Sequence, residues 1–161
     1  MPSRLPALAV AVVLAASTLT ACGGDHSYCS TLREDKPRLE ELAKRTGEKG
    51  ATGTAALGDT VTTLRGLRDD APDDLADEWD TLVGALEGLR DAVEESGADA
   101  SDFAGGRRPA GVTTGQYDAV VRAARELSST RVQQAGASIE QHAQDVCKVD
   151  LGTGLGSANG G

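Results

Sequence analysis

Two histidines and two cysteines near the ends of the chain have the types and spacing of a chemical site. His26 and Cys29 are separated by two residues, and His142 and Cys147 are separated by four. If the ends of the chain meet, these side chains form a Cys2His2 set, which is a known ligand set of structural zinc. One hypothesis is therefore a metal-binding protein that uses these four residues.

The start of the chain has the pattern of a secretory signal. A short segment with one positive charge, Arg4, is followed by a charge-free apolar stretch over residues 5–20. This stretch is shorter than the roughly 20 apolar residues that a membrane-spanning helix needs. We therefore expect residues 1–21 to be a signal peptide that is cleaved on export.

The apolar stretch ends in a short motif followed by Gly23 and Gly24, and the motif consists of Leu19, Thr20, Ala21 and Cys22. It resembles the lipobox of bacterial lipoproteins. The resemblance implies cleavage directly before Cys22, a diacylglycerol lipid on its thiol, and a lipid-anchored place on the extracytoplasmic face of the cell membrane. Two acyl chains, at about 0.8 kcal/mol per buried methylene, hold a protein stably where one does not. An ordinary signal peptide with a free Cys22 is the alternative.

If the lipid occupies Cys22, then Cys29 and Cys147 remain as a pair, 118 positions apart. Outside the membrane such a pair most naturally forms a disulfide. Chain-entropy arguments assign a bridge of this span about 4 to 5 kcal/mol, with real values often smaller. We favour the disulfide, with His26 and His142 exposed, because export favours oxidised thiols and His142 lies off the helical face of Cys147.

Composition limits the possible partners. The chain has 161 residues, with 16 basic and 25 acidic residues and a formal net charge of −9. Loss of Arg4 with the signal peptide makes the mature chain more acidic still. A chain this acidic repels nucleic acid and anionic lipid headgroups, so we expect no nucleic-acid partner. Its four aromatic residues give few platforms for stacking sugars or bases, and they are Tyr28, Trp79, Phe103 and Tyr117.

The mature chain is long enough for one domain. Residues 22–28 are expected to be the lipidated cysteine and a short tether of at most roughly 20 to 25 Å. Residues 29–149 are expected to form the domain. Residues 150–161, which are rich in glycine, are expected to be a disordered tail.

The apolar pattern of the domain is helical, without a convincing alternating strand. We expect an all-α fold, a bundle of four or five helices stapled end to end by one disulfide. The first helix covers 29–43, with Thr31 and Glu34 at capping-box spacing near its start and an interruption or kink at Pro37. The second covers 57–67.

The third helix is the clearest element. Its apolar residues recur at spacings of four and three, which places them in one stripe facing the core, and they are Leu75, Trp79, Leu82, Leu86, Leu89 and Val93. Pro72 is favourable in the first turn of this helix, and Gly97 is a plausible residue for its end. Gly84 and Gly88 lie on the opposite face, where glycine is less favourable than alanine in a helix. They are either neutral substitutions or a surface without side chains that lets the backbone of a partner approach closely.

The last part of the domain is divided by glycines and serines. Residues 98–114 are expected to form a long irregular loop that contains Arg107 and Arg108 and is either functional or mobile. A fourth helix over 117–127 and a fifth over 132–146 follow. Ser128 and Ser129 between them can cap a new start, although the two helices could also be one.

A group of carboxylates surrounds the start of the third helix, and it consists of Asp69, Asp70, Asp73, Asp74, Asp77, Glu78 and Asp80. A calcium site is conceivable, but no D-x-D-x-D-G loop with a distal Glu is present. The helix dipole explains carboxylates at this position, so we favour a solvated helix start. Asp99, Ser101 and Asp102 form a weaker group with no complete ligand set.

Several segments together resemble small uncharacterised actinobacterial lipoproteins of the Streptomyces kind. The segments are the lipobox-like motif, residues 28–30, residues 71–79 and residues 145–147. The resemblance spans most of the mature chain. It implies a location and a fold, and it supplies no mechanism.

No motif of a known catalytic site is present in the sequence. It contains no G-x-S-x-G, no H-E-x-x-H and no phosphate-cradling glycine loop after a strand, so we expect no enzyme and no cofactor besides the lipid on Cys22. We expect a non-enzymatic envelope module that contacts an envelope protein or a cell-wall component through its helices or the loop 98–114. The alternative is a zinc-binding lipoprotein that uses His26, Cys29, His142 and Cys147.

Overall fold

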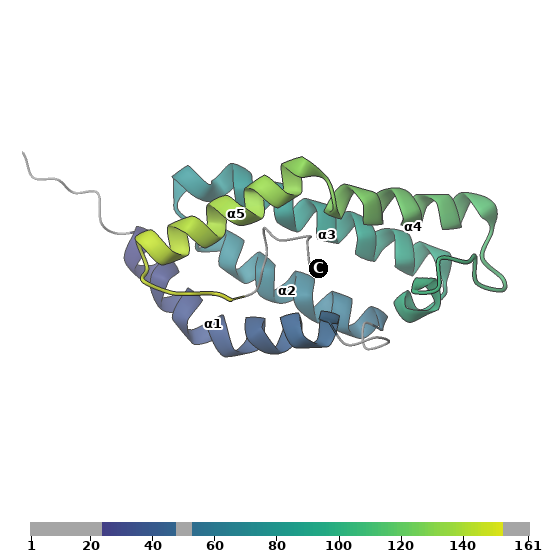
Figure 1. Ribbon diagram of the computed structural model, residues 1–161, viewed down its shortest axis with the longest axis horizontal. Coiled ribbons are helices and arrows are strands. Elements are labelled where there is room, and N and C mark those ends of the chain that lie inside the picture. The colour runs from purple at the N-terminus through teal and green to yellow at the C-terminus, as the bar shows by residue number, and fades with distance from the viewer. Residues whose placement is uncertain (1–23, 48–52, 153–161) are drawn as a thin grey trace, which may run out of the picture.

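The computed structural model describes residues 24–47 and 53–152 of the chain. The predictions for the signal peptide, for Cys22 and for residues 153–161 lie outside the described residues. Within them the protein is entirely helical, with five α-helices, two short 3-10 helices and no strand (Figure 1). The expected all-α fold with a single Cys29–Cys147 disulfide is confirmed.

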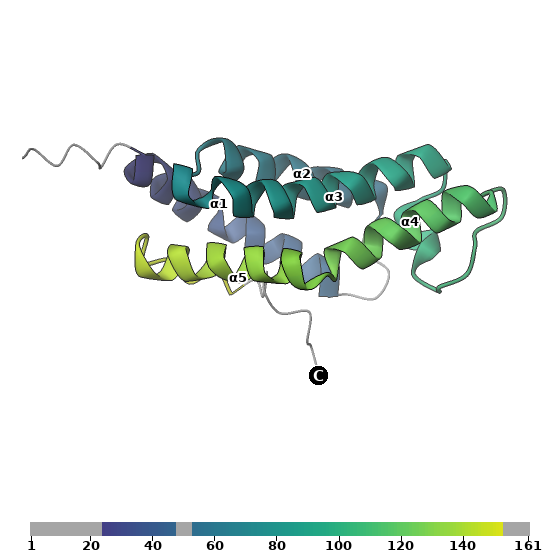
Figure 2. The same ribbon diagram turned by 90° about the horizontal axis from the view of Figure 1, so that it is seen from above.

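The elements follow one another in the order α1 Gly24–Gly47, α2 Thr54–Asp69, η1 Asp73–Leu75, α3 Ala76–Ser96, η2 Ala100–Phe103, α4 Thr114–Leu127 and α5 Thr130–Asp145. Helix α3 packs against α2, α4 and α5, whereas α1 packs against α2. Helices α4 and α5 run one after the other along the bundle (Figure 2). The molecule is therefore elongated, with the disulfide at one end and the loop before α4 at the other (Figure 1).

The predicted stripe on α3 forms the centre of the core. Trp79, Leu82 and Val93 of α3 are buried, and so is Leu75 of η1, as the spacing of four and three requires. Leu86 and Leu89 on the same face remain half-buried. Helix α3 itself begins at Ala76, so the expectation that Pro72 lies in its first turn is wrong, and Pro72 precedes η1 instead. The helix ends as predicted, because Gly97 follows it with a positive φ of 70°, a conformation that glycine adopts without strain.

The first helix is longer than the sequence predicted. It begins at Gly24, so residues 24–28 of the expected tether are helical, and the side chain of Tyr28 is fully buried. Thr31 therefore lies inside the helix, where its hydroxyl donates a hydrogen bond to the carbonyl of Ser27 at 3.2 Å, and the predicted capping box is wrong.

Pro37 lies inside this helix and does not divide it, so of the two expected outcomes, an interruption or a kink, the interruption is wrong. Proline removes one backbone donor from the ladder and favours a kink or an end. Leu32 before it and Leu39 after it are both buried in the same core, and the continuous helix bends between its first and second halves (Figure 1). Tertiary packing has kept the helix continuous at this proline.

The domain extends further toward the C-terminus than residue 149. Lys148 adopts a positive φ of 56° after α5, and the chain turns back, so that the amide of Val149 donates to the carbonyl of Ala143 at 2.8 Å. Val149 and Leu151 both join the core, and Leu151 is 1% exposed. The prediction of a disordered tail that begins at residue 150 is therefore wrong for 150–152.

Helices α4 and α5 are separate elements. Ser129 has an extended backbone and its hydroxyl accepts a hydrogen bond from the amide of Val132, which is the expected N-cap of α5. No helix among the described residues is both long enough and apolar enough to span a membrane.

Candidate functional site

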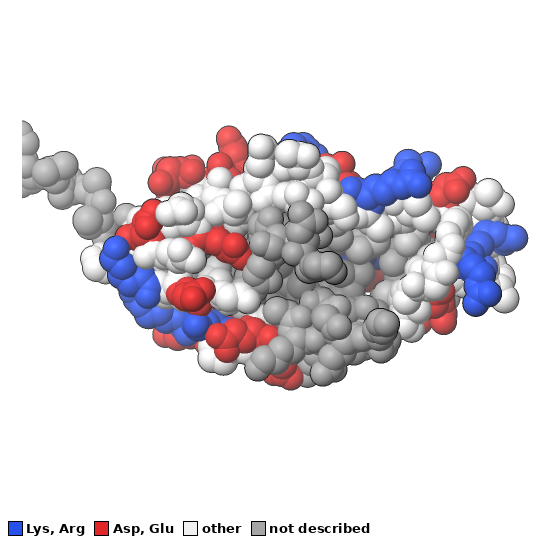
Figure 3. Space-filling view, in the orientation of Figure 1, with Lys and Arg blue, Asp and Glu red and all other residues white. Residues whose placement is uncertain are grey.

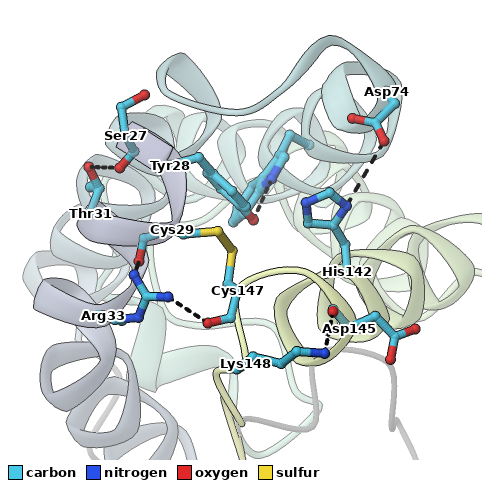
Figure 4. Close-up of a disulfide and its surroundings, with 11 residues drawn as sticks. Ser27, Tyr28, Cys29, Thr31, Arg33, Asp74, His142, Asp145, Cys147 and Lys148 are labelled. Atoms are coloured by element: carbon cyan, nitrogen blue, oxygen red, sulfur yellow. Dashed lines mark hydrogen bonds and ion pairs between the residues drawn. A yellow bond between two sulfur atoms is a disulfide. The ribbon is translucent and has the colours of Figure 1, made fainter. Parts of the chain in front are cut away.

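The Cys29–Cys147 disulfide closes one end of the bundle (Figure 4). Cys29 lies in the second turn of α1, and Cys147 lies two residues beyond the end of α5. The two Cα atoms are 5.0 Å apart, and both residues are buried. The bridge joins two segments that are 118 residues apart in the chain.

One arginine binds the main chain on both sides of the bridge. Arg33 donates from Nη1 to the carbonyl of Cys29 at 3.1 Å and from Nη2 to the carbonyl of Cys147 at 2.8 Å (Figure 4). Lys36, one turn later, donates to the carbonyl of Asp150 at 2.6 Å. Sequence reasoning missed both contacts; the only signal was the position of Arg33 four residues after a cysteine, on the same helical face.

An aromatic cluster lies beside the disulfide (Figure 4). Trp79 Nε1 donates a hydrogen bond to Tyr28 Oη at 3.3 Å, and the two rings meet edge to face with centroids 6.3 Å apart. The ring of His142 lies 5.9 Å from that of Tyr28 (Figure 4). Burial raises the pKa of Tyr28 to about 12, although the hydrogen bond from Trp79 acts in the opposite direction.

His142 does not match its expected exposure. Its side chain is only 11% exposed, Nδ1 lies 4.0 Å from the carboxylate of Asp74, and the buried Nε2 has no hydrogen-bond partner among the described residues. The face of α5 that carries His142 turns toward α1, where Tyr28 covers the ring. His26 is exposed, as expected.

The four residues of the zinc hypothesis do not form a ligand set in this structure. Both sulfur atoms are bonded to each other, so neither is available as a thiolate. In the part of the chain that the structure describes, no three His, Cys, Asp or Glu side chains are grouped as a metal ion requires.

The carboxylates at the start of α3 are spread over three elements. Asp69 pairs with Arg68 at 3.1 Å, and Oδ2 of Asp70 lies 2.9 Å from the hydroxyl of Thr31, where it is the alternative acceptor to the carbonyl of Ser27. Asp77 and Glu78 lie in the first turn of α3, where the helix dipole favours negative charge. The arrangement supports the solvated helix start rather than a calcium site.

The loop 98–114 contains more regular structure than its glycines predicted. Asp99 caps the 3-10 helix η2 by accepting from the amide of Ser101, and Thr113 forms a capping box with Gln116 at the start of α4. The rings of Phe103 and Tyr117 are stacked with centroids 6.3 Å apart. The hydroxyl of Tyr117 donates to the carbonyl of Gly106 at 2.7 Å, so the loop is tied to α4.

Asp99 also joins the loop to the start of α2. Its carboxylate accepts hydrogen bonds from the amide of Thr54 at 3.1 Å and from the hydroxyl of Ser101 at 2.6 Å. These hydrogen bonds, first those from Ser101 and then those from Thr54, lower the pKa of Asp99 to about 2. From the sequence, Asp99 belongs to a group with no complete ligand set, and in the structure the residue serves as a cap.

Gly84 and Gly88 are exposed on α3, as predicted, and a Cβ atom at either position would meet nothing within 4 Å. The backbone therefore does not require glycine there.

Comparison with known proteins gave no match to a protein family, to a curated protein or to a solved structure.

Proposed function

We propose that this chain is an exported bacterial lipoprotein of the small actinobacterial kind, held on the extracytoplasmic face of the cell membrane by a diacylglycerol on Cys22. The observation that carries the proposal is the buried Cys29–Cys147 disulfide. Structural disulfides form and persist in oxidising compartments outside the cytoplasm and are rare within it. This bridge supports export independently of the signal-like residues 1–21 and the lipobox-like motif.

The start of α1 at Gly24 bears on how such an anchor would hold the domain. Only one residue separates Cys22 from this helix, so the tether is much shorter than the sequence suggested. A helix of this length extends about 36 Å. The stapled end would thus lie next to the bilayer, and the loop 98–114, at the other end of the bundle, would face outward (Figure 1).

The outward end is the surface we propose for contact with an envelope protein or a cell-wall component. A group of basic side chains lies at that end of the molecule, and another lies at the opposite end (Figure 3). In the loop itself Arg107 and Arg108 are exposed. Arg108 is itself held in place by a hydrogen bond to the carbonyl of Val112. In a strongly acidic chain, this basic pair suits an acidic partner.

We propose a non-enzymatic role for the domain. A nucleophile needs a base within hydrogen-bond reach. Of the described cysteines, Cys29 and Cys147 are bonded to each other. His142, one of two histidines in the chain, packs against Tyr28. These arrangements favour a binding role over acyl or phosphoryl transfer.

Metabolic labelling tests the anchor. Bacteria that express the full chain and grow on an alkyne-tagged palmitate should yield a labelled protein in the membrane fraction. Cys22→Ala should abolish the label, and the matched change Ser17→Ala in the apolar stretch should leave it intact. A chain that carries no label, or a label that persists in Cys22→Ala, would overturn the proposal.

Site-specific photocrosslinking in cells tests the binding surface. A benzophenone amino acid at position 107 should give one discrete adduct, whereas the same group at Ser138, exposed on α5, should not. Replacement of Arg108 by Glu should weaken the adduct at position 107. Identical adducts from positions 107 and 138 would contradict a partner at the loop.

A further inference from the structure

A cavity of about 410 Å³ lies away from the disulfide, where α1, α2, α3, η2 and α4 meet. Small-molecule sites commonly range from roughly 300 to 1,000 Å³. Its wall contains Leu57 from α2, Leu86 and Leu89 from α3, and Phe103 from η2. These four side chains are large and apolar, of a kind usually found fully buried, but here each is only half-buried.

Small residues on the wall leave this volume open. Alanines occupy four of its positions, on α2, on α4 and in and beside η2, and they are Ala56, Ala100, Ala104 and Ala124. Ala104 and Ala124 are exposed, so the cavity opens to solvent and is not a sealed void of the core. Larger side chains at these positions would close it. The wall therefore has the form of a binding site rather than of a packed core.

The chemistry of the wall is that of a hydrocarbon. Among the described residues, every lining side chain except that of Thr60 is apolar. The hydroxyl of Thr60 already donates to the carbonyl of Ala56 within α2, at 2.9 Å. A polar group placed inside the cavity would lose its hydrogen bonds to water without replacement. The ligand portion that enters must therefore be apolar throughout.

The wall of the cavity follows two helices. On α3 its wall extends from Leu86 to Val93, and on α4 from Val120 to Leu127. Each span is two helical turns, about 10 Å along the axis. An extended chain follows such a slot, whereas a compact ring system fills only part of it.

We propose that this cavity binds the hydrocarbon chain of a small amphiphile, a single acyl chain whose polar end stays in water outside the cavity. The site does not depend on the anchor at Cys22, because Leu42, the part of α1 that lines it, lies about 27 Å along that helix from Gly24. The chain is supplied either by a free fatty acid or by a phospholipid.

Binding is measured on residues 23–161 in solution. Every buried side chain in the described part lies within residues 28–151, and the disulfide joins the two ends of that segment, so this piece contains the whole core. Circular dichroism verifies its folding. Fluorescence of cis-parinaric acid, an 18-carbon polyene acid, should rise to saturation at one equivalent.

Saturated acids of increasing length should then displace this probe in a graded way. Each added methylene should tighten binding about threefold to fourfold until the slot is filled, and longer chains should add nothing further. A probe signal without saturation, or displacement that does not depend on chain length, would overturn the proposal.

Two neighbouring alanines on α2 provide a matched pair of variants. Ala56 lines the cavity and Ala55 is exposed. Ala56→Phe should weaken the binding of parinaric acid at least tenfold, while Ala55→Phe should leave it within twofold of the original chain. If Ala56→Phe does not fold, Ala124→Leu fills the same cavity from α4. Equal losses in the cavity and surface variants would contradict the site.

Vesicles identify the source of the chain. The same protein is mixed with phosphatidylglycerol vesicles that carry a pyrene-labelled phosphatidylcholine. Transfer of the pyrene lipid to the protein, blocked by Ala56→Phe, supports a phospholipid chain. Binding of parinaric acid without transfer of the pyrene lipid supports a free fatty acid. Failure of both probes would overturn the proposal, with the proposed anchor at Cys22 unaffected.

Discussion

Trp79 Nε1 donates a hydrogen bond to Tyr28 Oη at 3.3 Å, and both side chains are fully buried. The bond connects the first turn of α3 to the residue of α1 that immediately precedes Cys29. Trp79 is the single tryptophan of the chain, so tryptophan fluorescence reports on this part of the core.

Tyr28→Phe should lower the free energy of unfolding by roughly 1 to 2 kcal/mol, because the buried indole N–H loses its acceptor. Urea denaturation followed by Trp79 fluorescence measures the loss. Tyr117→Phe removes an exposed tyrosine hydroxyl and should cost less. An equal effect of the two changes would show that the Trp79 contact adds nothing.

Tyr28 should also make the protein sensitive to alkali. Its folded-state pKa of about 12 lies above the ordinary value of 10.0, since burial favours the neutral phenol. The stabilisation is complete below pH 10 and is lost as the pH rises from 10 to 12, because only the unfolded state releases the proton there. The total is about 2 to 3 kcal/mol. The advantage of the original chain over Tyr28→Phe should therefore decrease over this interval and change sign near pH 12, and a constant difference would refute the shift.

Removal of the disulfide should destabilise the domain strongly. The double change of Cys29 and Cys147 to Ala should cost up to about 4 to 5 kcal/mol for a span of 118 residues. Thermal melting measures the cost. Unfolded, unreduced protein from residue 23 onward should present no thiol to a maleimide and two after reduction. Two thiols without reduction, protected in the native state until a chelator is added, would restore the zinc hypothesis.

Asp99 should give the protein an acid-dependent loss of stability. Its folded-state pKa of about 2 lies below the ordinary 3.8, so its stabilising effect is present above pH 4 and disappears as the pH falls through 2. Asp99→Asn should remove this part of the acid transition in melts between pH 1.5 and 4.5. Asp118→Asn, at an exposed position on α4, should not. If both variants retain the same acid transition, Asp99 does not link the loop to α2.

Features with a repeating pattern could be predicted from the sequence. The spacing of four and three from Leu75 to Val93 identified the buried face of α3, and Gly97 marked its end. Ser129 predicted the start of α5, because its hydroxyl can accept a hydrogen bond from the amide of the third helical residue. The disulfide followed from the number of cysteines once one was assigned to the lipid.

Features that depend on tertiary contacts could not be predicted. The sequence around Pro37 predicts an interruption or a kink, and the continuity of the helix is explained by the burial of Leu32 and Leu39 on either side of it. Leu151 lies in a glycine-rich sequence that resembles a disordered tail, yet it fills a place in the core. The cavity is the least predictable feature, because the spacing of Leu86 and Leu89 is that of any core-facing residues.

The disulfide near the two ends of the domain also determines how the protein responds to a pull or a cut. Tension applied ahead of Gly24 meets the sulfur bridge after five residues, so it is carried to the end of α5 instead of peeling α1 away from α2. A protease that cuts once between Cys29 and Cys147 opens a covalent ring and releases no fragment. Such a nicked domain keeps both pieces joined until a reductant reaches a bridge that is almost completely enclosed.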